Sequence, residues 1–198
     1  MMKTIHDELF QLKVSKWEYV QLQQAWSIVH DPWKYSAKEM LTVAKNNELT
    51  LAVEFLNRVD PDDYQYAVAS GKFMLDIPFE GTVILTRSLA VGHFGASVLT
   101  NVPRTCISGS PTGHEYGYGG SGPSDLALDI LNQFFPPKGK DRVKCFVGDC
   151  SAIAWEWRRP FGNRFIFGLE QQSDHAIPLG DILNWFANQK LIPTKNFK

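Results

Sequence analysis

Helical periodicity, with residues suited to start and end helices, marks the first third of the chain. Apolar side chains recur every three or four residues through 15–30, which predicts a helix with one buried face. Ser15 and Glu18 have the spacing of a capping box, in which a serine and a glutamate satisfy free backbone amides at a helix start. Ser36 and Glu39 repeat this spacing and predict a second start.

Two more helices are predicted after these. Helical spacing through 47–58 indicates the third helix. For the fourth, Asp60 is a natural N-cap, Pro61 suits the first helical position, and Gly71 can end the helix in a left-handed conformation. The aromatic residues of this region, Trp17 among them, have the spacing expected of side chains that pack between helices.

The periodicity changes near Pro78. The segments 81–91 and 93–101 are short, rich in Val, Leu, Ile and Thr, and separated by Gly92, which predicts two adjacent antiparallel strands. The segment 142–148 predicts a further strand.

Two helices are predicted in this second part of the chain. Leu126, Ile130 and Phe134 follow one another at four-residue steps, in a helix that Pro136 ends and that should pack on the strands. The segment 178–190 has helical spacing too.

These elements predict an α+β fold, with a small antiparallel sheet and packed helices. We expect a helical N-terminal region over 1–75 and an α+β domain over 76–198, either as separate parts or as one fused core.

A glycine-rich loop, Gly117 to Ser124, leads into the helix that contains Leu126. Its glycines allow a sharp turn or a close approach, Pro123 presets a helical φ, and Ser121 is the expected N-cap. Free amides and the helix dipole at such a start attract anions. The candidate anion ligands are Gly119, Gly120, Ser121, Gly122 and Ser124.

The spacing of this loop argues against a nucleotide site. It lacks the lysine of the Walker pattern and the strand and acid of the dinucleotide fingerprint. Asp125 in the first turn already supplies negative charge to the helix dipole. We therefore favour a structural turn and keep an anion or phosphate site as the alternative.

Aromatic and arginine side chains concentrate in the segment 155–164, a composition found at protein interfaces and in stacking on nucleobases. A structural alternative is that Trp155 and Trp157, two residues apart, line one face of a strand over the core. With the loop tyrosines, the candidate interface residues are Tyr116, Tyr118, Trp155, Trp157, Arg158, Arg159 and Arg164.

Charge and cysteine content exclude several function classes. Twenty basic and 21 acidic residues give a net charge of -1, so no global field draws the chain to nucleic acid or to an anionic membrane. Three cysteines at irregular spacing predict free thiols in a reducing compartment. Without a signal peptide or a long apolar run, we expect a cytoplasmic protein in a bacterial cell that contacts no membrane.

Catalytic and metal sites have weak support in the sequence. His114 and Glu115 beside Ser121 suggest acid–base chemistry, but no nucleophile-elbow motif surrounds the serine. Cys145 and Cys150 have no second pair with which to hold zinc. We predict no catalytic residue, no metal and no cofactor.

The run YGYGGSGPSDLALDIL at 116–131, followed by WRRPFGNRFI and IPLGDILNWF, resembles a family of small bacterial and phage domains of unknown function. The resemblance covers about residues 80–189. It implies a small α+β fold and an origin in phages or other mobile elements, and it implies no particular activity.

We therefore expect a non-enzymatic binding protein from a phage or other mobile element, an anti-defence inhibitor that occludes a host or rival protein complex. One alternative is a small enzyme or ligand binder that uses the Gly117–Ser124 loop as a phosphate site. The other is nucleic-acid binding through Trp155–Arg164.

Overall fold

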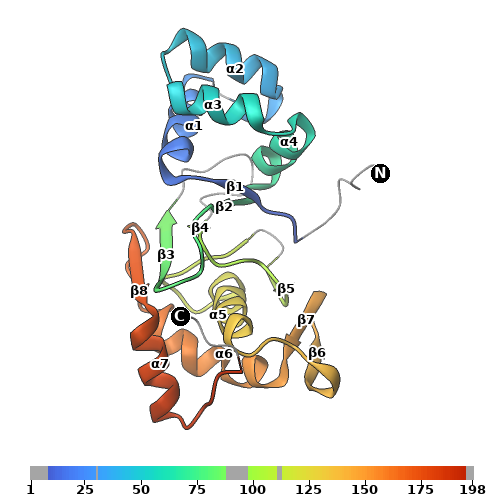
Figure 1. Cartoon of the computed structure of the whole chain (residues 1–198), viewed down its shortest axis with the longest axis vertical. Coiled ribbons are helices and arrows are strands. Elements are labelled where there is room, and N and C mark those ends of the chain that lie inside the picture. The colour runs from blue at the N-terminus through green and yellow to red at the C-terminus, as the bar shows by residue number, and fades with distance from the viewer. Residues whose placement is uncertain (1–8, 30, 88–97, 111–112, 195–198) are drawn as a thin grey trace. The chain divides into compact units, whose positions relative to one another are not determined.

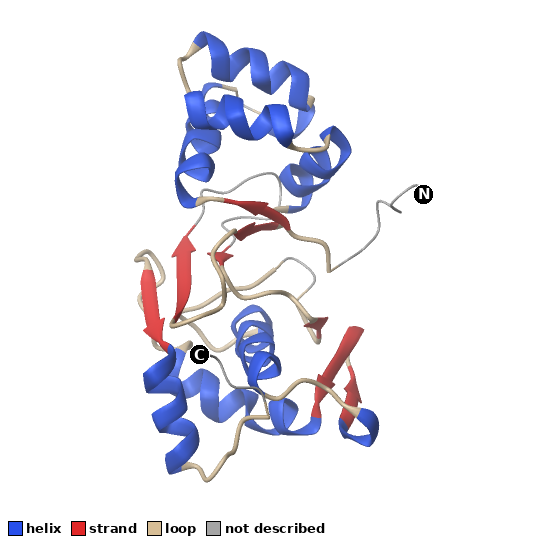
Figure 2. Ribbon diagram, viewed as in Figure 1, coloured by secondary structure: helices blue, strands red, loops and turns tan. Residues whose placement is uncertain are grey.

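The structure is a computed structural model of the 198-residue chain and describes residues 9–29, 31–87, 98–110 and 113–194 (Figures 1 and 2). The described residues divide into two compact units, one that ends at Ile77 and one that begins at Pro78. Helices and small sheets make up the fold, which confirms the predicted α+β class. Each described helix is too short or too polar to span a lipid bilayer.

The described residues of the first unit form four α-helices and two short strands. The elements are β1 (Leu12–Val14), α1 (Lys16–Ile28), the 3₁₀ turn η1 (Pro32–Lys34), α2 (Ala37–Asn46), α3 (Thr50–Arg58), α4 (Pro61–Ser70) and β2 (Phe73–Leu75). β1 and β2 pair in parallel, with Leu12 opposite Phe73. The sequence analysis missed both strands, because three residues are too few to show a period of two.

The predicted helix caps of the first unit are confirmed. Ser15 and Glu18 form a reciprocal capping box at α1, as do Ser36 and Glu39 at α2. The Asp60 side chain accepts hydrogen bonds from the first amides of α4, whose C-cap glycine has a φ of 67°.

Aromatic side chains fill the core of the first unit. Tyr19, Trp26 and Phe73 meet edge to face or tilted, and the buried Trp26 Nε1 donates to the Tyr64 hydroxyl at 3.0 Å. Burial raises the pKa of Tyr64 to about 12. Trp17 is different, since 67% of it is exposed. Trp17 is therefore an exception among the aromatic residues that were mostly expected to pack between helices.

Three helices and six strands of the second unit are described. The elements are β3 (Thr82–Arg87), β4 (Val98–Thr100), β5 (Cys106–Ile107), α5 (Ser121–Phe134), the 3₁₀ turn η3 (Gly139–Asp141), β6 (Arg142–Lys144), β7 (Val147–Ser151), α6 (Ala152–Phe165), β8 (His175–Pro178) and α7 (Leu179–Asn188).

The strands of the second unit form two antiparallel sheets, in the orders β4-β3-β8 and β5-β7-β6. The predicted pairing of β3 with β4 is confirmed by the register of Leu85 opposite Thr100, while residues 88–97 between them lie outside the described part. β8, which pairs with β3, was missed, because its sequence HAIP is short and not alternating.

α5 is the buried centre of the second unit, with β3 and β8 on one side and β6 and β7 on the other (Figure 1). It contacts β5, β7 and α6, whereas the strands predicted before it lie within 81–101. The rings of Phe134 and Phe135 lie 5.0 and 5.2 Å from that of Phe186 on α7, which joins the two helices.

The segment with Trp155 and Trp157 is helix α6 and not a strand, so the strand alternative is wrong. The Ser151 side chain caps α6 by accepting from the amide of Ala154, and Pro160 is accommodated inside the helix. Two residues on a helix are about 200° apart, so the two indoles cannot share a face as they would on a strand.

Candidate functional site

Gly117 explains the sharp turn at the start of the glycine loop. Its φ is +84°, and a Cβ at this position would lie 2.7 Å from the carbonyl oxygen of Leu169. The Gly117 amide donates to the carbonyl of Ile166 at 3.0 Å, and the Gln171 side chain donates to the Gly117 carbonyl at 3.1 Å. The loop therefore packs backbone to backbone against 166–171.

The later glycines also serve close packing. A Cβ on Gly120 would collide with the ring of Tyr118, and one on Gly122 would lie 2.8 Å from Cβ of Glu115. α5 begins at Ser121 with Gly120 as its N-cap, so the prediction of Ser121 as N-cap is wrong by one position. The backbone of Gly120 is extended, and because glycine has no side chain it leaves room for the ring of Tyr118.

Some of the candidate anion ligands already take part in contacts within the chain. The Ser124 amide donates to the Gly120 carbonyl at 3.1 Å, and Pro123 has no amide hydrogen. Gly122 is buried, whereas Gly119 and Ser121 are exposed. Few amides of this first turn are therefore left to point at a ligand, and the geometry favours the structural turn.

Tyr116 belongs to the core and not to a surface, so it is not an interface residue. Its hydroxyl donates to the Ser173 carbonyl at 2.7 Å, and its ring meets His175 edge to face at 5.2 Å. The guanidinium of Arg87 lies 4.3 Å from the ring centre and is paired with Glu115. Burial raises the pKa of Tyr116.

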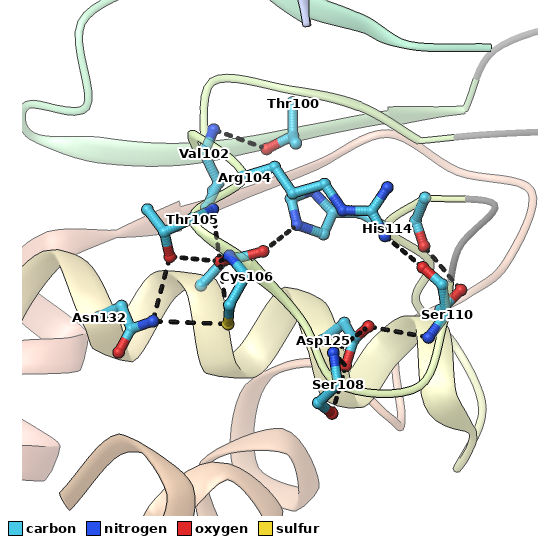
Figure 3. Close-up of polar contacts among 12 residues, drawn as sticks. Thr100, Val102, Arg104, Thr105, Cys106, Ser108, Ser110, His114, Asp125 and Asn132 are labelled. Carbon is cyan, nitrogen blue, oxygen red and sulfur yellow. Dashed lines mark hydrogen bonds and ion pairs between the residues drawn. The ribbon is translucent and has the colours of Figure 1, made fainter. Parts of the chain in front are cut away.

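Asp125, on α5, fastens the loop that precedes the glycine run (Figure 3). Its carboxylate accepts from the hydroxyl of Ser108 at 2.6 Å and from the amide of Ser110 at 2.9 Å. The amides of Ser108 and Gly109 also donate to it, at 3.2 to 3.3 Å. The sequence predicted that Asp125 complements the helix dipole, and it did not predict these hydrogen bonds to 108–110.

Asp129, one turn further along α5, holds two segments at once. Oδ1 accepts from the amide and the hydroxyl of Thr105, at 2.8 and 2.6 Å, and from the amide of Cys106 at 3.1 Å. Oδ2 shares a hydrogen bond of 2.7 Å with Nε2 of the buried His114. The aspartate thereby joins Thr105 and the start of β5 to His114, which precedes the glycine loop.

Asn132 completes a polar stripe on this otherwise apolar helix. Its Nδ2 donates to the Thr105 hydroxyl at 3.0 Å, and its Oδ1 accepts from the Ser151 amide at 3.1 Å. Positions 125, 129 and 132 lie on one helix face. With its lone pairs occupied by donors, each carboxylate suits a structural tie better than proton transfer.

The three cysteines converge although they come from separate strands and turns. Cys145 and Cys150 have their sulfur atoms 3.5 Å apart. Hydrogen bonding by the Cys106 thiol, helped by Cys145 and by the Arg158 guanidinium, lowers the pKa of Cys150 to about 7 against the effect of burial. Burial, and then the bond to Cys150, raise the pKa of Cys145 to about 12.

The arginines and tryptophans of α6 separate into covered and exposed groups. The Arg158 guanidinium lies 3.7 Å from the ring centre of Trp155, and Trp157 meets Trp185 edge to face at 5.7 Å. Arg159 and Arg164 are exposed. One face of Trp155 is thus covered by Arg158 of the same helix.

Among the described residues of the second unit, the most exposed aromatic side chain lies on the β6–β7 hairpin, and the sequence analysis overlooked it. Phe146 is 78% exposed, against 43% for the predicted Tyr118. Four exposed basic residues precede it: Lys138, Lys140, Arg142 and Lys144. Arg142 and Lys144 pair with Asp149 at 3.5 and 3.2 Å. A lone aromatic in a basic run is a signal that could have been read from the sequence.

In the part of the chain that the structure describes, no group of three His, Cys, Asp or Glu side chains is arranged to hold a metal ion. Comparisons of the chain with family models, with curated proteins and with solved structures found no match. The family resemblance of the glycine motif therefore stays a prediction.

Proposed function

We propose that the chain is a non-enzymatic binding protein whose second unit contacts a protein partner through the tip of the β6–β7 hairpin. The carrying observation is the exposure of Phe146 beside a basic strand, in a unit whose other large side chains are mostly buried. Exposed aromatic residues next to arginine are typical of interface anchors.

The charge of the hairpin indicates the kind of partner. Between 138 and 149 the four basic side chains outnumber the two acidic ones, Asp141 and Asp149, which leaves a local charge of +2 (4 − 2) in a chain of net charge -1. β6 is also an edge strand, whose free side can pair with another strand. An acidic surface or an acidic extended segment would complement both features.

The biological role within this proposal comes from the resemblance of the glycine motif. A protein of a phage or other mobile element that binds a host or rival complex would act by occlusion, as an anti-defence inhibitor. The contacts of His114, Asp125 and Asp129 support binding over catalysis, because these groups already hold the chain together.

A site-specific photocrosslinker tests the contact. Replacing Phe146 by p-benzoylphenylalanine and irradiating bacterial cells that express the chain should give a discrete protein adduct. Ile192, which is 84% exposed in the same unit, is the matched position for the control. Lys144→Glu in the Phe146 variant should reduce the adduct, because the charge complementarity is lost.

The other outcomes would refute the contact at the hairpin or favour one of the two alternative functions. Equal crosslinking from both positions, or none from Phe146, would refute a contact at the hairpin. An adduct that nucleases remove, with binding that falls steeply as salt rises, would favour the nucleic-acid alternative. A rise in melting temperature with a nucleotide, lost in Ser121→Ala, would favour the phosphate-site alternative.

A further inference from the structure

Strand pairing gathers the three cysteines around Gly148 on β7. Cys106 on β5 is the register partner of Gly148, and the amide of Cys145 donates to the Gly148 carbonyl at 3.2 Å. Cys150 follows two residues along β7, opposite Val143, which precedes Cys145 by two. Because residues two apart in a strand point to the same face, Cys145 and Cys150 project together.

The two sulfurs of this pair differ in access. Cys150 is fully buried, whereas Cys145 is partly exposed and adjoins the exposed Phe146 at the hairpin turn. Their separation of 3.5 Å is a contact between thiols that a shift of about 1.5 Å would bring to the length of a disulfide bond. A reagent from solvent therefore meets Cys145 first, with Cys150 directly behind it.

Cys106 differs from the other two in its surroundings. The side chain of Asn132 donates to its sulfur at 3.6 Å, and Oδ1 of Asp129 lies 3.8 Å from it. Hydrogen bonding to Cys150, burial and the nearby Asp129 raise the pKa of Cys106 well above its usual range. Cys106 is thus held as a protonated thiol that supports a thiolate on its neighbour.

We propose that Cys145 and Cys150 form a dithiol site that exchanges with small disulfides, such as oxidised glutathione, and closes into an internal disulfide. Cys145 is the attacking residue, and Cys150 resolves the mixed disulfide. The site lies on one hairpin of the second unit and needs no protein partner.

The exchange balances without any further reactant. Cys150 starts as the thiolate of the pair and takes the proton of Cys145. The Cys145 thiolate attacks one sulfur of the small disulfide, whose S–S bond breaks and releases a thiolate. That thiolate takes the proton from Cys150. The Cys150 thiolate then attacks the Cys145 sulfur and expels the second small thiolate. The two cysteines are oxidised to a disulfide, and the small disulfide is reduced to one thiol and one thiolate.

Oxidised glutathione is the probe for this site. We expect the reduced, folded protein to form the Cys145–Cys150 bond and to retain no glutathione. Trypsin cleavage after Lys144 and Arg158 gives a peptide, 145–158, that holds both cysteines, so mass spectrometry should find it lighter by two hydrogen atoms. Retained glutathione, a link to Cys106 or three unchanged thiols would overturn the proposal.

Single-cysteine variants separate the roles. Cys150→Ser should accumulate glutathione on Cys145, more slowly than the wild type reacts, because the base that takes the Cys145 proton is lost. Cys145→Ser should take up none while folded, because Cys150 is buried. Cys106→Ser should still close the disulfide. Glutathione on Cys150 in folded Cys145→Ser would overturn the assignment of the attacking residue. Circular dichroism checks folding, and the wild-type peptide map stands even if a variant unfolds.

Arginine variants give a readout that a merely structural thiol pair would not move. Below neutral pH, Arg158→Gln should slow closure by about threefold, because the guanidinium helps to lower the pKa of Cys150 and its loss leaves less of Cys150 as the thiolate. Arg159→Gln, exposed on the same helix, should leave the rate unchanged. Equal rates in both variants would remove Arg158 from the site.

Discussion

The two units of the chain are held together by different kinds of polar contact. In the first unit these contacts are mainly local: Ser15 and Glu18, or Ser36 and Glu39, cap helices from three residues away. In the second unit the polar side chains of α5 bind groups 15 to 27 residues away and are buried. Local sequence therefore describes the first unit well and the second only in part.

Removing the buried carboxylate of Asp129 should have the largest effect on stability. Asp129→Ala leaves buried donors on Thr105, Cys106 and His114 without their acceptor, so we expect a loss of about 3–5 kcal/mol in the free energy of unfolding. Urea unfolding followed by circular dichroism measures it. Glu156→Ala, at an exposed site of α6, is the control. A loss below about 1 kcal/mol would show that the stripe on α5 is dispensable.

The glycine loop should be next in sensitivity. Gly117→Ala forces a side chain into a left-handed conformation and against the Leu169 carbonyl, which should cost up to about 3 kcal/mol. Gly119→Ala is the matched change, because a Cβ there meets nothing within 4 Å. Thermal unfolding of the two variants compares them, and equal melting temperatures would contradict this account of the turn.

The first unit also has long-range polar contacts that blur the contrast, and the hydrogen bond from Trp26 to Tyr64 is a buried one. Tyr64→Phe leaves the buried Trp26 Nε1 without its acceptor, and we expect a loss of about 1–2 kcal/mol in urea unfolding. The Tyr66 hydroxyl contacts Lys72 at a partly buried site, so Tyr66→Phe should lower the free energy of unfolding by less. A larger loss from Tyr66 would mean that burial does not determine the cost.

Local caps should give the smallest effect. Ser36→Ala removes the acceptor for the amide of Glu39, and caps of this kind are worth about 1 kcal/mol. Ser27→Ala, inside α1 and exposed, should leave the melting temperature nearly unchanged. A Ser36 effect as large as that of Asp129 would remove the difference between the two units.

The sequence predicted what depends on neighbouring residues. The α+β class, the helix starts at Ser15 and Ser36, and the pairing of β3 with β4 all follow from local spacing and composition. The strands β1, β2 and β8 were missed because pairing with distant residues, more than their own pattern, makes them strands.

The candidate site was less predictable for the same reason. The burial of Tyr116 depends on Ser173 and His175, which lie far along the chain. Two tryptophans in a short aromatic run suggested a strand, whereas the cap from Ser151 makes the segment a helix. The two aspartates of α5 look like surface residues in the sequence, because no neighbouring residue indicates that they bind the segment 105–110.

The polar stripe of α5 has a consequence for amide hydrogen exchange. The amides of Thr105, Cys106, Ser108, Gly109 and Ser110 all donate to the two aspartates, although most of these residues lie outside any strand ladder. Their exchange with deuterium should therefore be slow, as in regular secondary structure. Removal of the Asp129 carboxylate should speed exchange at Thr105 and Cys106, and removal of the Asp125 carboxylate should speed exchange at 108–110. Exchange in this irregular loop would then measure how often its contacts with α5 open.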